Sequence, residues 1–305
     1  MIDVLQLVPL RPEVQSQLEA RYRVHPKDRL DAVAGVVRAV VTNGHSGPAP
    51  ELIDRLPKLE IIGSASVGYD GIAVDYARSK GIPVTNTPDV LNDDVADLAI
   101  ALMTMTARRL VASDRYVRAG RWPKEGEYPL AWRASGKRVG ILGMGRIGRA
   151  IARRAEAMNN SIAYHARHPV ADLSYRHYPV LAELARDSDF LIVIVPATPQ
   201  TSRIVNREVL EALGPEGILV NVARGAVVDE DALVAALKSG KLGGAGLDVF
   251  ADEPHVPEAL FAMDNVTLLP HVGSATFETR RAMSQLVVDN LDAYFAGRPL
   301  LTEVK

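Results

Sequence analysis

The sequence predicts an α/β protein with two domains, each built around a parallel sheet. Its 305 residues suit two domains of ordinary size. Short apolar segments alternate with helical segments in both halves of the chain, as crossover connections between parallel strands require. Near the middle, the apolar segment Val139-Gly140-Ile141-Leu142 leads into a glycine-rich turn and then into a stretch of good helix formers.

The first third of the chain predicts the smaller sheet. Strands are expected at 4–9, 22–24, 39–42, 59–64 and 84–86, with helices at 12–20, 49–56 and 72–80 between them. Neither Gly nor Pro interrupts residues 93–119, so one long helix is expected there. An irregular arm then extends from Gly120 to Gly136.

The rest of the chain predicts the larger sheet. Its strands are expected at 139–142, 161–165, 190–195, 218–222, 245–249 and 266–269, with helices at 149–158, 203–213, 230–239 and 278–295. Asp229 and Gly240 are suitable caps for the helix at 230–239. We therefore expect one domain from residues 1–98 with 287–305, and a second from residues 99–286.

Composition excludes several classes of function. The net charge is −2, and the chain is 48% apolar and 24% charged, which is ordinary for a globular enzyme. No basic cluster indicates binding to nucleic acid or to a membrane. The absence of cysteine excludes disulfides, thiolate metal ligands and a cysteine nucleophile. No metal site is predicted. Neither a signal peptide nor an apolar stretch of about 20 residues is visible, so a soluble cytoplasmic protein is expected.

The glycine turn, Gly143-Met144-Gly145-Arg146-Ile147-Gly148, indicates a dinucleotide site. Its first glycine permits the tight turn, the second lets the backbone approach a pyrophosphate, and the third lets helix and strand pack closely. The N–H groups at the start of the helix face the anion. A glycine-rich turn without a ligand is the alternative, but the strand before it and the helix after it favour a Rossmann-type, doubly wound sheet.

The next strand indicates which dinucleotide is bound. An NAD site of this type usually has Asp or Glu about 20 residues on, to bind the ribose 2′-hydroxyl. Here Arg167 follows the strand, and no acid occurs between Asn159 and Val170. An arginine can bind a 2′-phosphate with two N–H groups. A surface arginine without a ligand is the alternative. We predict a preference for NADPH, with NADH as the other possible cofactor.

Three charged residues follow consecutive predicted strands of the larger sheet. Arg224, Glu253 and His271 come after the strands at 218–222, 245–249 and 266–269. Open α/β sheets bind their ligands at the carboxyl ends of the strands, so these side chains can converge. Taken singly, each has an ordinary structural explanation: a surface ion pair, a solvated loop residue and a structural histidine.

Together, these residues suit the reduction of a 2-keto acid beside a nicotinamide. A fixed cation holds the carboxylate and polarises the keto oxygen, and a proton donor supplies the hydroxyl proton. A carboxylate next to the donor orients the imidazole and favours its protonated form.

The chain resembles the D-2-hydroxyacid dehydrogenase family over nearly its whole length. Besides the glycine turn, the matching motifs are Thr87-Pro88-Asp89-Val90-Leu91, Asp93-Asp94-Val95-Ala96-Asp97-Leu98-Ala99, Pro196-Ala197-Thr198-Pro199-Gln200-Thr201, Asn221 to Gly225, Gly244-Ala245-Gly246-Leu247-Asp248-Val249-Phe250 and Pro270-His271-Val272-Gly273-Ser274-Ala275-Thr276. Within the family the chain is most similar to the NADPH-preferring glyoxylate/hydroxypyruvate reductases and their hydroxyphenylpyruvate-reducing relatives. Tyr164-His165-Ala166-Arg167 and residues 280–286 fit that branch.

The resemblance implies roles for individual residues. Arg224 is the substrate-binding cation, His271 the proton donor and Glu253 its partner, while Val67 and Gly68 offer backbone N–H groups to the substrate carboxylate. The implied cofactor contacts are Gly143, Met144, Gly145, Arg146, Ile147, Ala166, Arg167, His168, Pro196, Thr198, Val222, Ala223, Asp248 and Gly273. Asp248 and the backbone near Ala223 would hold the nicotinamide amide. The first domain is implied to be flavodoxin-like and to bind substrate, and the protein to be a homodimer.

The chain departs from its branch at three positions. Ala166 stands where the branch often has Ser, and Ala197 and Ala223 replace bulkier residues.

A dinucleotide-sensing, corepressor-like binding protein is the alternative from another class, but such proteins carry interaction extensions outside the dehydrogenase core. A phosphoglycerate dehydrogenase would have an acid after the second strand. A formate dehydrogenase would have Gln where Glu253 stands.

Overall fold

The computed structural model describes residues 1–305, and the chain divides into two compact units. The first comprises Met1–Leu91 and Ser274–Lys305, and the second Asn92–Gly273. The boundaries expected from the sequence, 98/99 and 286/287, fall inside the helices α5 (Asn92–Ala107) and α12 (Phe277–Phe295). The structure divides the chain before each of these helices, because a helix packs as one body.

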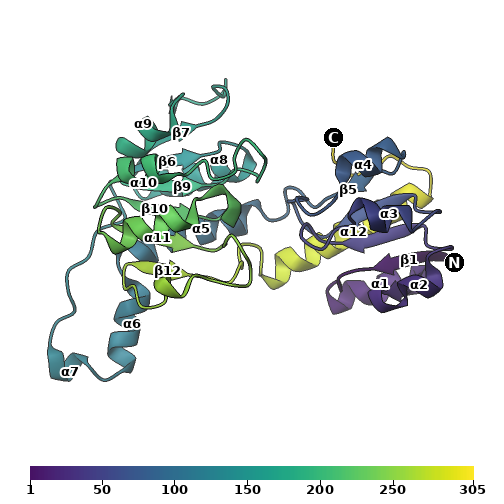
Figure 1. Cartoon of the computed structure of the whole chain (residues 1–305), viewed down its shortest axis with the longest axis horizontal. Helices are drawn as coiled ribbons and strands as arrows, with labels where there is room; N and C mark the ends of the chain where they lie inside the picture. The colour runs from purple at the N-terminus through teal and green to yellow at the C-terminus, as the bar shows by residue number, and fades with distance from the viewer. The chain divides into compact units, whose positions relative to one another are not determined.

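The first unit is a parallel sheet with helices on both faces (Figure 1). Its strands are β1 (Ile2–Gln6), β2 (Tyr22–Pro26), β3 (Ala39–Thr42), β4 (Ile61–Ser64) and β5 (Val84–Thr85). Its other helices are α1 (Pro12–Arg21), α2 (Leu30–Val33), α3 (Pro50–Asp54) and α4 (Val74–Ser79), with a 3₁₀ turn, η1 (Lys27–Arg29). The strand order β2-β1-β3-β4-β5 is the flavodoxin-like order.

Alternate residues of the central strands of this sheet face two separate apolar cores. Val4 of β1 and Ile61 of β4 lie in one core with residues of α1 and α12. Leu5 and Ile62, the next residue in each strand, lie in the other core with residues of α3 and α4. Successive side chains of a strand point to opposite faces, so both faces are covered and the strands are apolar throughout.

The second unit is a seven-stranded parallel sheet. Its strands are β6 (Arg138–Leu142), β7 (Ser161–His165), β8 (Arg176–His177), β9 (Phe190–Val193), β10 (Ile218–Asn221), β11 (Gly244–Leu247) and β12 (Val266–Leu268). Its other helices are α6 (Leu110–Arg118), α7 (Trp122–Glu125), α8 (Arg146–Ala157), α9 (Leu181–Arg186), α10 (Arg207–Leu213) and α11 (Glu230–Lys238), with 3₁₀ turns η2 (Gly225–Val227) and η3 (Glu258–Leu260).

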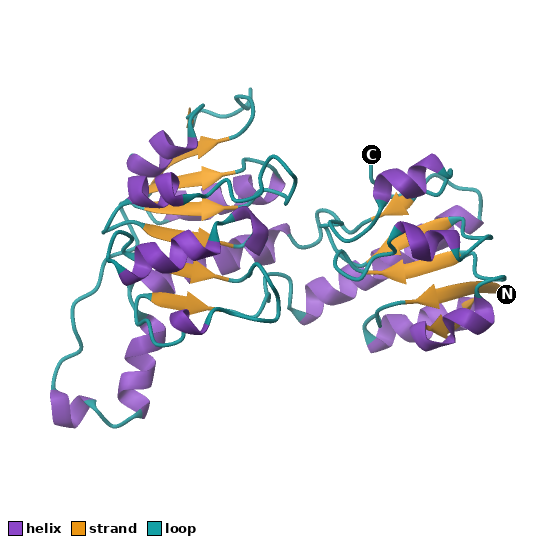
Figure 2. Cartoon of the chain, viewed as in Figure 1, coloured by secondary structure: helices purple, strands orange, loops and turns teal.

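The order of these strands places the dinucleotide turn at the centre of the sheet. The order is β12-β11-β10-β9-β6-β7-β8. Counted from β6, this is the 3-2-1-4-5-6 order of dinucleotide-binding folds with one further strand. Helices α5 and α8 cover one face, and α9, α10 and α11 cover the other (Figures 1 and 2). The strand order reverses between β6 and β9, where such folds bind ligands.

The prediction of one continuous helix at 93–119 is wrong. The α5 helix ends at Ala107, and Arg109 adopts a left-handed conformation with φ = 50° before α6 begins. Because that conformation cannot continue a right-handed helix, the chain turns here without Gly or Pro. Val95 and Leu102 of α5 are buried within the second unit. The elements α2, α7, β8 and α9 were also not foreseen from the sequence, and α7 lies inside the arm that was expected to be irregular.

Two helix termini show why the sequence-based bounds shifted or held. The helix expected from residue 203 begins at Arg207, because Asn206 accepts a hydrogen bond from the Val209 N–H at 3.1 Å and caps it. Asp229 caps α11 as predicted, since its Oδ1 accepts from the Ala232 N–H at 3.0 Å. Nowhere in the chain is a helix long and apolar enough to cross a membrane.

Candidate active site

The glycine turn leads from β6 into α8, and each of its glycines meets a different demand. Gly143 has φ = 103°, which other residues rarely adopt, and an added Cβ would lie 2.5 Å from the Ile194 carbonyl oxygen. A Cβ on Gly148 would lie 2.1 Å from the Gly143 carbonyl oxygen. Gly145 instead borders open space, with nothing within 4 Å of an added Cβ. The turn is therefore tight on two sides and accessible at its middle glycine.

The N-terminus of α8 lies at this accessible point. Gly145 is the N-cap residue, and it makes no side-chain hydrogen bond that would cap the helix. Arg146 and Ile147 begin that turn, while Met144 is buried. Unbonded N–H groups at a helix start attract anions. The open space at Gly145 and the uncapped turn fit the pyrophosphate of a dinucleotide.

A loop with exposed basic residues follows β7. Arg167 and His168 are exposed after the partly buried Ala166, and the Arg167 side chain forms no ion pair in the structure. The acid that comes next in the sequence, Asp172, pairs with Arg149 of α8 at 3.3 Å. The loop thus presents a cation and no unpaired carboxylate, an arrangement that fits the 2′-phosphate of NADPH.

The predicted cofactor residues after β9 and β10 lie in fixed turns. The Thr201 hydroxyl donates to the Pro196 carbonyl at 2.7 Å, and the Thr198 N–H donates to the Thr201 Oγ1 at 2.8 Å. Val222 and Ala223 are buried directly after β10. Both turns lie at the carboxyl edge of the sheet. Their strands, β9 and β10, are on the same side of the point where the strand order reverses.

Asp248, after β11, is a buried carboxyl group that fixes a turn. Its Oδ1 accepts a hydrogen bond from the Val272 N–H at 2.7 Å, and its Oδ2 accepts from the Gly273 N–H at 2.9 Å. Burial raises the pKa of the Asp248 carboxyl above its ordinary value, and these two bonds act in the opposite direction. Its carbonyl accepts from the His271 N–H at 2.8 Å. Asp248 therefore positions the turn that carries His271, a role that the sequence did not reveal.

His271 and Glu253 are in direct contact. The His271 Nδ1 lies 2.7 Å from Oε2 of Glu253. An ionised carboxylate only accepts, so Nδ1 carries a hydrogen and Nε2 is the ring atom that can exchange a proton. Oε1 of Glu253 accepts from the Phe250 N–H at 3.1 Å. The carboxylate is therefore fixed at both oxygens and holds the imidazole in one orientation. His271 also has φ = 55°, a conformation uncommon outside glycine and often found at functional sites.

Arg224 lies in a turn that packs against the same segment. Its Nη1 donates to the Ala223 carbonyl at 2.7 Å. The Asn221 side chain donates to the Arg224 carbonyl and accepts from the Ala223 N–H, both at 3.1 Å. A Cβ on Gly225 would lie 1.9 Å from the Phe250 carbonyl carbon, so only glycine allows this approach. No role was assigned from the sequence to Asn221, Gly225 or the Phe250 N–H, although a polar residue at the end of a strand and a glycine shortly after it are a signal that could have found the first two.

The three predicted catalytic residues thus come from neighbouring strand ends of one sheet. β10 pairs with β11, and β11 with β12. His271 and Glu253 are bonded to each other, and the turn of Arg224 touches the backbone that holds the glutamate. The arrangement provides a held proton donor and a cation on the carboxyl edge of the dinucleotide sheet.

The predicted substrate residues Val67 and Gly68 belong to the first unit, in the loop after β4. Asn86 donates to the Val67 carbonyl at 2.9 Å, and the Ser66 hydroxyl donates to the Gly68 carbonyl at 2.6 Å. The backbone N–H groups of Val67 and Gly68 form no hydrogen bond within this unit. The loop is therefore held through its carbonyl groups and keeps its donors for another acceptor.

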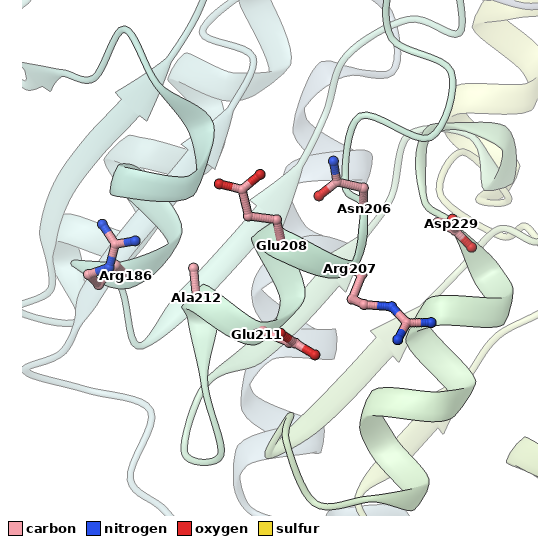
Figure 3. A pocket seen from close by; sticks show the side chains of 7 residues that line it. All are labelled: Arg186, Asn206, Arg207, Glu208, Glu211, Ala212 and Asp229. Carbon is pink, nitrogen blue, oxygen red and sulfur yellow. The ribbon is translucent and has the colours of Figure 1, made fainter.

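A shallow hollow of about 700 Å³ lies elsewhere on the second unit, beside α10 and α11 (Figure 3). Asn206 and Asp229, which line it, are the N-cap residues of these helices. Glu211 pairs with Lys241 at 2.9 Å. Asn206, Asp229 and Glu211 thus have structural partners, and the hollow contains none of the predicted site residues.

Comparison with known proteins gives the family. The sequence model of the D-isomer specific 2-hydroxyacid dehydrogenase NAD-binding domain matches residues 100–273. The chain belongs to this family. Hydroxyphenylpyruvate reductase of Plectranthus scutellarioides is 51% identical over 99% of both chains. Glyoxylate/hydroxypyruvate reductase A of Arabidopsis thaliana is also 51% identical, again over 99% of both chains.

A solved structure of a family member agrees with the fold. The NADPH-dependent glyoxylate/hydroxypyruvate reductase of Sinorhizobium meliloti, crystallised with NADP and malonate, matches with a TM-score of 0.94 and 47% identity, covering 99% of this chain and 96% of that one. The predicted family, the α/β fold with a Rossmann-type domain and the assignment as an enzyme are confirmed. This member of the D-2-hydroxyacid dehydrogenases is an oxidoreductase with a nicotinamide dinucleotide cofactor.

Proposed function

We propose that this dehydrogenase reduces small 2-keto acids, such as glyoxylate and hydroxypyruvate, to D-2-hydroxy acids with NADPH as hydride donor. The observation that carries the proposal is the 2.7 Å contact between His271 and Glu253, because it prepares a histidine to give up a proton at Nε2. The relatives named as glyoxylate/hydroxypyruvate reductases support the substrate class.

The proposed roles follow from the chemistry of the side chains. Arg224 binds the substrate carboxylate and polarises the keto oxygen, since a guanidinium matches a carboxylate with two N–H donors. The bound nicotinamide cofactor supplies the hydride to the keto carbon. His271 gives the proton at Nε2 to the keto oxygen, and Glu253 stabilises the imidazolium before this transfer. The first unit, through the N–H groups of Val67 and Gly68, contributes to binding the substrate carboxylate.

The cofactor residues are proposed as a set. The glycine turn and the start of α8 hold the pyrophosphate, and Arg167 with His168 holds the 2′-phosphate. The nicotinamide side is formed by Pro196, Thr198, Val222, Ala223, Asp248 and Gly273, with Ala166 next to the adenosine ribose.

The substrate class is tested with a panel of 2-keto acids, each assayed with NADPH and with NADH. We expect the highest kcat/KM for glyoxylate or hydroxypyruvate with NADPH, and hydroxyphenylpyruvate is the informative larger substrate. A parent enzyme that prefers NADH would contradict the cofactor proposal. Activity confined to acids outside the panel would contradict the substrate proposal.

Replacing Arg167 with alanine should reduce NADPH use selectively. The loss of a charge-assisted contact to the 2′-phosphate is expected to cost about 1.5–3 kcal/mol, which corresponds to a decrease of about 10- to 150-fold in kcat/KM for NADPH. NADH lacks this phosphate, so its kcat/KM should stay nearly constant. Arg176→Ala, in the nearby β8, is the matched control, because Arg176 is also exposed. Equal losses with both cofactors would remove Arg167 from the proposed role.

A homodimer is proposed through α6, α7 and the arm that follows, which extend from the body of the second unit (Figure 1). Val117, Trp122 and Leu130 are 53%, 59% and 96% exposed there. Exposed apolar side chains gathered on one segment are typical of interfaces, and a two-fold dimer covers the same patch on both chains.

Light scattering should therefore give about twice the chain mass of 33.0 kDa at micromolar concentration. Val117→Asp should shift the protein toward monomer, whereas Phe261→Asp, equally exposed at 55% but outside the arm, should not. A parent protein with the mass of one chain would contradict the dimer.

A cytoplasmic location also stays a proposal, which cell fractionation would check.

A further inference from the structure

The loop 166–170, which carries Arg167 and His168, is held at both ends by side chains of the sheet. At its start, the Ala166 carbonyl oxygen lies 2.9 Å from Nε2 of His177. At its end, the Val170 N–H donates to the Tyr164 hydroxyl oxygen at 2.8 Å. The residues between these two bonds are exposed. The two side chains therefore define where the exposed part of the loop begins and ends.

The two side chains that hold the loop are neighbours in the sheet. Tyr164 in β7 and His177 in β8 are direct register partners in a parallel pair, and their ring centroids lie 5.2 Å apart. Tyr164 is 1% exposed, so its hydroxyl reaches the loop from inside the domain. A carbonyl oxygen only accepts, so Nε2 of His177 carries the hydrogen of the other bond. Strand β8 has only two residues, and pairing with β7 places its histidine under the loop.

We propose that Tyr164 and His177 are positioning residues that hold the loop 166–170 so that Arg167 is presented to the 2′-phosphate of NADPH. The inference rests on the proposed NADPH preference and adds its structural cause. A guanidinium binds phosphate with a fixed geometry of parallel N–H groups, so the backbone that carries it must be well placed. Ordering an exposed loop only when the ligand binds costs affinity, and a loop already bonded at both ends avoids that cost.

Tyr164→Phe tests the bond at the end of the loop. The substitution removes one oxygen and keeps the buried ring against His177. A hydrogen bond between neutral groups contributes about 0.5–1.5 kcal/mol, so the Kd for NADPH should rise about 2- to 10-fold. The Kd for NADH should stay unchanged, because that cofactor has no 2′-phosphate for the loop to hold. Both constants are measured by titration calorimetry on the intact enzyme.

His177 is tested with two substitutions that separate its ring from its donor. His177→Phe keeps a ring beside Tyr164 but removes the donor to Ala166, and should weaken NADPH binding selectively. His177→Gln offers an amide N–H group in its place and should restore most of the NADPH affinity. A purely structural role for the ring would give the opposite order, with phenylalanine tolerated and glutamine not.

Tyr178→Phe is the matched control. It also removes a buried tyrosine hydroxyl from the second unit, where Tyr178 donates to Asp187 at 2.6 Å without touching the loop. It should leave the ratio of the two cofactor affinities unchanged. If Tyr178→Phe lowers NADPH affinity as much as Tyr164→Phe does, the effect is general loosening of the domain and the inference is overturned.

A double-mutant cycle with Arg167→Ala completes the test. If the holding bonds act through Arg167, then Tyr164→Phe should have a much smaller effect on NADPH binding once Arg167 is alanine, because only His168 then remains for the loop to present. Additive losses would overturn the inference. If Arg167→Ala is selective for NADPH but Tyr164→Phe is not, only the positioning role fails. If Arg167→Ala weakens both cofactors equally, the proposed NADPH preference fails first, and the inference fails with it.

Discussion

Replacing His271 with alanine should lower kcat for 2-keto acid reduction by about 10²-fold or more while NADPH still binds. General acid catalysis by a positioned side chain contributes on this scale. The side chain lies in a turn that Asp248 fixes through three backbone N–H groups, so the turn survives the loss of the imidazole. Steady-state kinetics and NADPH titration by fluorescence measure the two quantities separately.

The control for this substitution is His255→Ala. His255 also lies near a carboxylate, with its Nδ1 3.4 Å from Oδ2 of Asp252, but its side chain is 80% exposed. Its loss should leave kcat unchanged. Near-normal turnover of the His271→Ala enzyme with intact NADPH binding would mean that another group supplies the proton, and the assigned mechanism would be wrong.

Glu253→Gln tests the partner of the histidine. Reduction consumes a proton, which the imidazole delivers in the proposed mechanism. The neutral amide no longer stabilises the imidazolium, so kcat should fall, while the amide oxygen still accepts from Nδ1 and keeps the ring in place. A parent-like kcat would show that Glu253 orients the ring without stabilising its charge.

Much of the candidate site could be predicted because its residues follow the predicted strands in sequence order. The order of strands and the residue after each strand place Arg224, Glu253 and His271 on one sheet edge, and parallel topology makes the strand ends meet. The glycine turn could also be predicted from the sequence, since the tight backbone contacts at Gly143 and Gly148 leave no space for the side chain of any other residue.

What could not be predicted depends on contacts between distant segments. The break at Arg109 is a left-handed residue that no local pattern marks. The two-residue strand β8 has no hydrophobic period to reveal it, so the bond from His177 to the loop 166–170 could not be predicted before the fold was known. Asp248 was associated with the cofactor by resemblance, but its bonds to the turn of His271 appear only when β11 and β12 lie side by side.

Replacing Arg224 with lysine should lower kcat/KM for the keto acid by about 10²- to 10³-fold, the scale on which the loss of a preorganised group at a developing oxyanion is felt. Lysine keeps the charge but cannot form the planar pair of N–H bonds to a carboxylate. It also cannot keep the contact of Nη1 with the Ala223 carbonyl, which sets the direction of the guanidinium.

Arg207→Lys, at an exposed arginine beside the hollow of Figure 3, is the conservative control and should leave kcat/KM unchanged. NADPH affinity and Tm of the Arg224→Lys enzyme should match those of the parent, because the turn is held by Asn221 and by the packing of Gly225 against Phe250. A fall in Tm with the fall in activity would assign Arg224 to the fold. Parent-like kcat/KM in a stable Arg224→Lys enzyme would show that a point charge suffices, and the two-bond recognition of the substrate carboxylate would have to be abandoned.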